Sequence, residues 1–99
     1  MRFYSEYVNH MLRLYVRHRR TPENELKKRA DVINWETVKE VLDDLDKYDR
    51  NVIIKIYEKR DTISDNVLEV SKELNLHQDI IWTLLNKVTK QIAKERGLI

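Results

Sequence analysis

The polar side chains best suited to contacting another molecule gather near the start of the C-terminal segment. Amide, hydroxyl and ammonium groups recur there at spacings that place most of them on one face of a helix. The set is Gln78, Thr83, Asn86, Lys87 and Lys90. Such groups donate hydrogen bonds to phosphate oxygens and to the base edges exposed in the major groove. The chemistry that this pattern predicts is recognition of duplex DNA.

A second basic group lies near the N-terminus. Residues 1–29 hold eight Lys and Arg against three Asp and Glu, although the whole chain carries a net charge of only +2. The arginines of this group are Arg13, Arg17, Arg19 and Arg20. Each phosphate that such cations neutralise makes DNA binding more dependent on salt. The sequence leaves open whether this segment contacts phosphates or an acidic partner, or is only a soluble basic face.

Apolar side chains interrupt the polar set of the C-terminal segment. Ile80 and Trp82 stand among its polar positions, and Asp79 brings a negative charge near the expected phosphates. A Trp exposed to water beside an Ile is typical of a packed surface or a protein interface. We therefore expect Trp82 to pack on the N-terminal helix or on a partner. The N-terminal tyrosines Tyr4, Tyr7 and Tyr15 are expected in the core or at a dimer contact.

Other chemistry is poorly supported. The chain has no Cys, so it cannot form a disulfide or a thiolate metal site, and its three His residues are widely separated. Asp43, Asp44, Asp46 and Asp49 form an acidic cluster without the Gly and distal Glu of a calcium loop. No nucleophile stands beside a plausible base. We expect no enzymatic activity, no metal and no cofactor.

Composition indicates a small all-α domain. The 99 residues suffice for one modest core. A single Gly and a single Pro cannot supply the turns that a many-stranded fold needs. Charged residues interrupt the N-terminal apolar residues, which argues against a signal peptide or a membrane span. We expect a cytoplasmic protein without a membrane contact.

One amphipathic helix is expected before the Pro. Apolar residues recur at helical spacing from Phe3 to Tyr15, and the basic run that follows ends at Thr21 and Pro22. Residues 23–29 are mostly charged. The pattern leaves residues 21–33 as either a short helix or a linker.

Two further helices are expected in the middle of the chain. An apolar stripe from Asn34 to Leu45 predicts the first, with Asn34 or Asp31 as its N-terminal cap. Residues 50–59 form the second, with Asp49 as its cap. Its β-branched run would also suit a strand, but no second strand is evident to satisfy the backbone.

The C-terminal residues predict two helices separated by a short break. The first begins at Asp65 or Asn66, and the second covers residues 78–96 and ends at Gly97. Between them, Asn75 can adopt a left-handed conformation and Leu76 can act as a hydrophobic pin. Such a turn is typical of a helix-turn-helix.

Three other positions suit the packing of a helix-turn-helix. Ser71 is small enough to let the second helix cross closely, while Ile81 and Leu84 anchor that helix. The fold class predicted from the sequence is therefore a single-domain bundle of about five helices with a C-terminal helix-turn-helix.

These residues carry a resemblance to a known family. Residues 45–92 resemble the C-terminal, promoter-reading domain of bacterial sigma factors. The stretch LDKYDRNVIIKIY, residues 45–57, is similar to that domain's opening helix, and VSKELNL, residues 70–76, to the helix and turn before its recognition helix. The resemblance covers about half of the chain. In that family the positions equivalent to Gln78, Asp79, Trp82, Thr83 and Asn86 are rich in Arg, which this chain lacks there.

The resemblance implies a function and a domain division. Residues 1–44 are too short for a sigma factor's polymerase-binding domain, and the arrangement is similar to small phage regulators of the ArpU and RinA types. It implies a transcriptional regulator of phage or mobile-element type, with residues 78–96 as the recognition helix. A basic helix and linker, residues 1–30, would pack on a sigma-like domain, residues 31–99. The alternative is a protein-interaction adaptor that docks on RNA polymerase or self-associates through Ile80 and Trp82.

Overall fold

The computed structural model describes residues 4–19 and 26–99, and its regular elements within these ranges are all α-helices. The expected all-α class and the expected number of about five helices are confirmed. In chain order they are α1 (Ser5–His18), α2 (Arg29–Asp43), α3 (Lys47–Glu58), α4 (Ile63–Leu74) and α5 (Gln78–Arg96). The predictions for Phe3 and for residues 20–25 fall outside the described residues.

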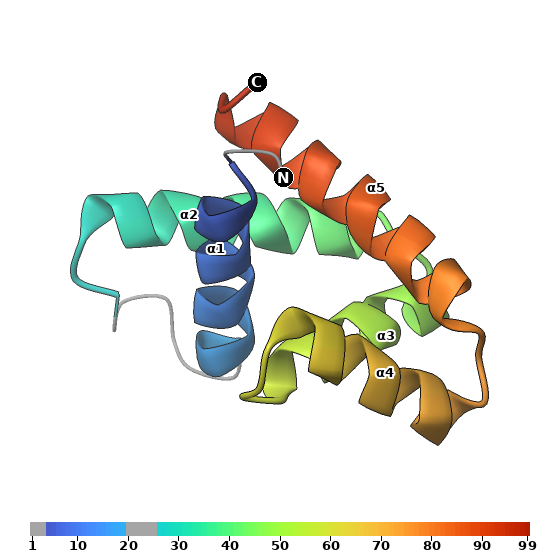
Figure 1. Ribbon diagram of the computed structural model, residues 1–99. Coiled ribbons are helices and arrows are strands. Elements are labelled where there is room, and N and C mark those ends of the chain that lie inside the picture. The colour runs from blue at the N-terminus through green and yellow to red at the C-terminus, as the bar shows by residue number, and fades with distance from the viewer. Residues whose placement is uncertain (1–3, 20–25) are drawn as a thin grey trace.

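The long helix α5 joins two groups of helices. Figure 1 shows α1 lying across α2, with α3 and α4 beside the N-terminal end of α5 and the C-terminal end of α5 near α1 and α2. Side chains from all five helices meet in one hydrophobic cluster. Its largest fully buried members include Met11, Leu12, Leu42, Ile53 and Ile92. The helices therefore share a single core.

The start of α2 differs from the prediction. The helix begins at Arg29, after Lys28, and neither Asp31 nor Asn34 caps it. Ala30 and Asp31 both suit a first helical turn, and exposed N–H groups at a helix start can be satisfied by water. The far end also differs, because the helix stops at Asp43 and not at Leu45.

Asn34 has a different role from the one expected. It lies inside α2 and is only 2 % exposed. Its Nδ2 donates to the Tyr7 hydroxyl at 2.9 Å, and its Oδ1 accepts from Arg96 Nε at 2.7 Å. One buried amide thus links α1, α2 and the end of α5.

The helices α3 and α4 each begin about one turn earlier than predicted. Asp46 caps α3 by accepting from the Asp49 N–H at 2.8 Å, and Thr62 caps α4 by accepting from the Asp65 N–H at 3.2 Å. The predicted cap Asp49 and the predicted helix start, Asp65 or Asn66, therefore lie inside the first helical turns. Polar residues stand at both the cap and the third position, so spacing alone favours neither.

Two other expectations about the elements are confirmed. The β-branched run after Asn51 lies within α3 and sends Val52 and Ile53 into the core, so it is helical and not a strand. The predicted bounds of α5 are those observed, and Gly97 ends the helix with a φ of 82°. None of the helices among the described residues is long and apolar enough to cross a membrane.

Candidate nucleic-acid interface

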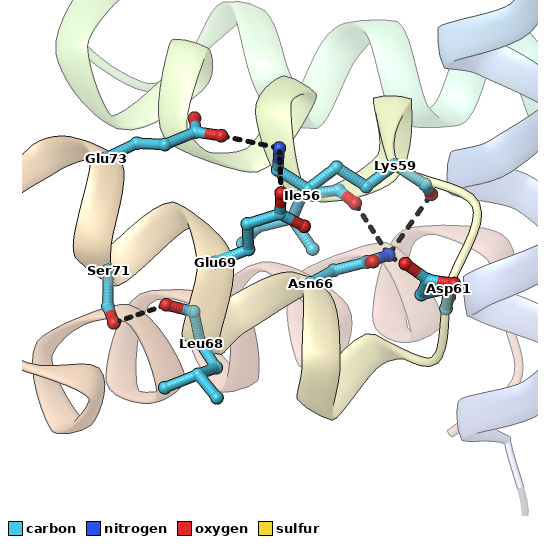
Figure 2. Close-up of polar contacts among 8 residues, drawn as sticks. All are labelled: Ile56, Lys59, Asp61, Asn66, Leu68, Glu69, Ser71 and Glu73. Atoms are coloured by element: carbon cyan, nitrogen blue, oxygen red, sulfur yellow. Dashed lines mark hydrogen bonds and ion pairs between the residues drawn. The ribbon is translucent and has the colours of Figure 1, made fainter.

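A three-residue turn connects α4 to α5. Asn75 adopts the expected left-handed conformation, with φ 53° and ψ 45°. The Leu76 N–H then donates to the Ser71 carbonyl at 3.0 Å, and the Leu76 side chain packs against the core. Ser71 is buried, and its hydroxyl donates to the Leu68 carbonyl at 2.7 Å within α4 (Figure 2). This turn determines where the N-terminal end of α5 begins.

The five polar residues predicted to contact DNA on α5 are all exposed. They are Gln78, Thr83, Asn86, Lys87 and Lys90. Lys94 continues the row one turn after Lys90 and is exposed too. Among the residues that the structure describes, none of these three lysines has an ion-pair partner. We call the outward face formed by Thr83, Asn86, Lys87, Lys90 and Lys94 the lysine stripe.

The start of α5 is less favourable to an anion. Asp79 is exposed, and its N–H donates to His77 Nδ1 at 3.2 Å. The Asp79 carboxylate lies 3.6 Å from the same imidazole nitrogen. Thr83 donates its hydroxyl to the Asp79 carbonyl at 2.8 Å, so this hydroxyl is left to act as an acceptor. Positive charge on α5 is therefore concentrated after its first turn.

Ile80 and Trp82 do not form one surface. Ile80 is 58 % exposed, whereas Trp82 is partly buried against the core. Residues two positions apart on a helix are separated by about 200° around its axis, so the two side chains leave opposite flanks of α5. The packing expected for Trp82 is found inside the molecule.

A small apolar groove lies beside Ile80, between the N-terminal ends of α3 and α5. It has a volume of about 250 Å³, and Tyr48, Val52, Ile80 and Leu84 contribute its apolar lining. Asp49 and Lys87 are charged residues of its lining. Tyr48 is 55 % exposed and was missed as a candidate. The sequence did offer a signal for Tyr48, because this aromatic residue lies outside the apolar stripe that predicts the buried face of α3.

The predicted arginine series is divided between different contacts. Arg13 donates to the Asp61 carbonyl at 3.3 Å, and its guanidinium carbon lies 5.9 Å from the centroid of the Tyr57 ring. Arg19 forms an ion pair with Glu58 at 3.2 Å. Arg17 is exposed, and Arg20 is outside the described residues. Two of the four arginines therefore tie α1 to the region where α3 ends.

The same region forms a basic cleft, defined by Arg13, Arg17, Lys59 and Arg60 together with Val16, Tyr57 and Glu58. Its volume is about 700 Å³. Lys59 and Arg60 were not among the predicted site residues, although two adjacent cations at the end of a predicted helix were a visible signal. What the sequence could not indicate is that they lie beside α1.

Polar contacts hold the backbone around the basic cleft (Figure 2). Asn66 is fully buried, and its Nδ2 donates to the carbonyls of Ile56, Lys59 and Asp61 at 3.0, 3.1 and 3.2 Å. Lys59 Nζ pairs with Glu73 at 2.6 Å, and this hydrogen bond is the main reason that the pKa of Glu73 is lowered. The connection between α3 and α4 is therefore held by two sets of contacts, the hydrogen bonds from Asn66 and the ion pair of Lys59 with Glu73.

The acidic cluster has contacts of its own. Asp43 pairs with Lys39 at 2.7 Å and with Arg50 at 3.5 Å, while Asp46 caps α3. Across residues 4–19 and 26–99, no group of three or more His, Asp or Glu side chains is arranged to hold a metal ion. The observed contacts of the Asp43 and Asp46 carboxylates are structural.

Comparison with known proteins adds no relative. The chain matches no family model, and no curated protein or solved structure is significantly similar to it.

Proposed function

We propose that this protein binds double-stranded DNA through α5 and acts as a transcriptional regulator of the phage or mobile-element type. The observation that carries the proposal is the lysine stripe, where exposed cations that pair with no carboxylate of the described residues lie on one helix with an amide and a hydroxyl group. In this proposal α4, the turn at Asn75 and α5 act as a helix-turn-helix. The function implies a cytoplasmic location.

The chemistry of the stripe suits a major groove. Lys87 and Lys90 would neutralise phosphates, and Asn86 can form two hydrogen bonds with the edge of an adenine. Gln78, at the first helical position, can do the same at the end of α5 that enters the groove. Asp79 would repel phosphates, so contacts to the backbone are expected farther along the helix.

The test is a salt-dependent binding measurement with charge-reversed variants. We expect Lys87→Glu combined with Lys90→Glu to weaken binding to a labelled duplex by at least tenfold, because two phosphate contacts become repulsive. Lys39→Glu combined with Lys55→Glu makes the same change of net charge on α2 and α3, away from the stripe, and is the matched control. If the unmodified protein shows no binding to duplex DNA at low salt, the proposal is wrong.

A protein-interaction adaptor is the second candidate, and the apolar groove beside Ile80 favours it. Tyr48 and Ile80 expose large apolar surfaces to one groove, which is typical of a contact with a protein such as RNA polymerase or a second copy. Ile80→Asp combined with Tyr48→Ala should abolish any self-association measured by light scattering. Trp82→Ala is less informative, because Trp82 also packs on the core.

A further inference from the structure

The basic cleft gathers more positive than negative charge. Among the described residues, four cations line it, namely Arg13, Arg17, Lys59 and Arg60, against one carboxylate, Glu58. That carboxylate is already neutralised, because Arg19 pairs with it at 3.2 Å from outside the lining. Lys59 is in turn paired with Glu73 and Glu69, so the positive charge that the described lining presents to solvent comes from Arg13, Arg17 and Arg60.

The four cations differ in how firmly they are held. Arg13 is fixed by the Asp61 carbonyl and the Tyr57 ring, and Lys59 is fixed by its ion pairs with Glu73 and Glu69. Arg17 and Arg60 are both exposed. Neither has an ion-pair or hydrogen-bond partner among the residues that the structure describes. These two guanidinium groups are the ones available to a ligand.

The rest of the lining offers little that would recognise a base or a sugar. Val16 is apolar, and Tyr57 is only 4 % exposed. The Tyr57 hydroxyl donates to Asn9 Oδ1 at 2.6 Å. No amide side chain stands among the described residues that line the cleft. A ligand would thus be recognised by charge, and the planar guanidinium of Arg can donate two parallel hydrogen bonds to two oxygens of one phosphate group.

We infer that the basic cleft binds phosphates of a DNA backbone next to the groove that α5 enters. This inference rests on the proposed function. Lys59 and Arg60 precede the N-terminal end of α4, whereas α5 begins beyond its C-terminal end (Figure 1). With 12 residues, α4 is about 18 Å long. The length of α4 between the cleft and the start of α5 exceeds the major-groove width of about 12 Å. If α5 enters the groove, the cleft is therefore placed to contact the sugar-phosphate backbone that borders the groove, and not the base edges inside it.

The inference is tested by replacing the two available cations. In the full chain, Arg17→Ala combined with Arg60→Ala should reduce the slope of log affinity against log salt by about 2, since each lost phosphate contact removes about 0.9. The probes are a duplex of about 20 base pairs, two helical turns, selected from a random library, and its scrambled version. The ratio of the two affinities should not change, because phosphate contacts carry no sequence information.

Controls separate this inference from the proposed function. Lys39→Ala combined with Lys55→Ala removes the same charge outside the cleft and should leave the salt slope within the error of the unmodified protein. Circular dichroism checks that every variant is folded. An unchanged slope in the Arg17 and Arg60 variant, or a changed affinity ratio, overturns the cleft as a phosphate site. If Lys87 and Lys90 variants still weaken binding in that case, the role of α5 stands.

Discussion

The side-chain amide of Asn66 organises the backbone between α3 and α4. Its Nδ2 donates to the carbonyls of Ile56, Lys59 and Asp61, and the residue is fully buried. The Asp61 carbonyl also accepts from Arg13. Buried carbonyls without a donor are costly, so this one residue holds the connection in a single conformation.

Replacing Asn66 should therefore destabilise the whole protein. We expect Asn66→Ala to lower the free energy of unfolding by about 2 to 3 kcal/mol, because the buried Ile56 carbonyl and the part-buried Lys59 carbonyl lose this donor. Urea unfolding measures the change. Asn51→Ala, at an exposed position of α3, is the control and should change the free energy by less than about 0.5 kcal/mol. Equal effects of the two substitutions would contradict this role.

The ion pair between Glu73 and Lys59 predicts a pH dependence. The hydrogen bond from Lys59 lowers the pKa of Glu73 below its ordinary value of 4.5. The contribution of the pair to stability is complete above that ordinary value and is lost as the pH falls through the lower folded value. A carboxyl NMR titration should find a depressed pKa for Glu73 that returns toward 4.5 in Lys59→Met. A pKa that Lys59→Met leaves unchanged would show that the pair is not its cause.

At the scale of elements, the turn between α4 and α5 depends on the backbone of Asn75. Its φ of 53° lies in the left-handed region, where most side chains crowd the following carbonyl. Asn tolerates this conformation and Gly adopts it freely. The angle between the two helices thus depends on the residue type at one position.

Two substitutions at this position should have opposite outcomes. Asn75→Val should cost about 1 to 2 kcal/mol, since a β-branched residue is strained at positive φ, whereas Asn75→Gly should be tolerated. Thermal unfolding of both variants measures the difference. Equal stabilities would mean that the turn changes conformation to accommodate the Val.

At the scale of the whole molecule, α1 belongs to the same core as α3, α4 and α5. Val8, Met11 and Leu12 are fully buried in the shared cluster. Burying three such side chains contributes about 5 to 9 kcal/mol, which is comparable to the total stability of a small domain. The two arginines that pair with the end of α3 add polar contacts to this packing.

Removal of α1 should therefore prevent folding. We expect a chain that lacks residues 1–28 to lose cooperative thermal unfolding and to have a reduced helical signal by circular dichroism. The full chain should unfold in a single transition, because α5 contacts both groups of helices. A truncated chain with a sharp transition would instead support residues 31–99 as an independent domain.

The sequence by itself determined the features that depend on neighbouring residues. Apolar periodicity predicted the helical class, and the residue types of Asn75 and Gly97 predicted two left-handed helix ends. The exposed polar row of α5 followed from its spacing alone. Helix starts were less certain, because Asp46 and Asp49 are both acceptable caps and only the packing of α3 selects between them.

Only the tertiary structure decided which distant groups meet. Asn34 and Arg96 are separated by 62 residues, and Arg19 and Glu58 by 39, so no local pattern connects them. The basic cleft exists because α1 packs beside the end of α3. The same packing brings Arg13 into contact with Asp61 and Tyr57, and Arg19 into an ion pair with Glu58. Periodicity shows which face of a helix is apolar, whereas the pairing of charges depends on which helices share the core.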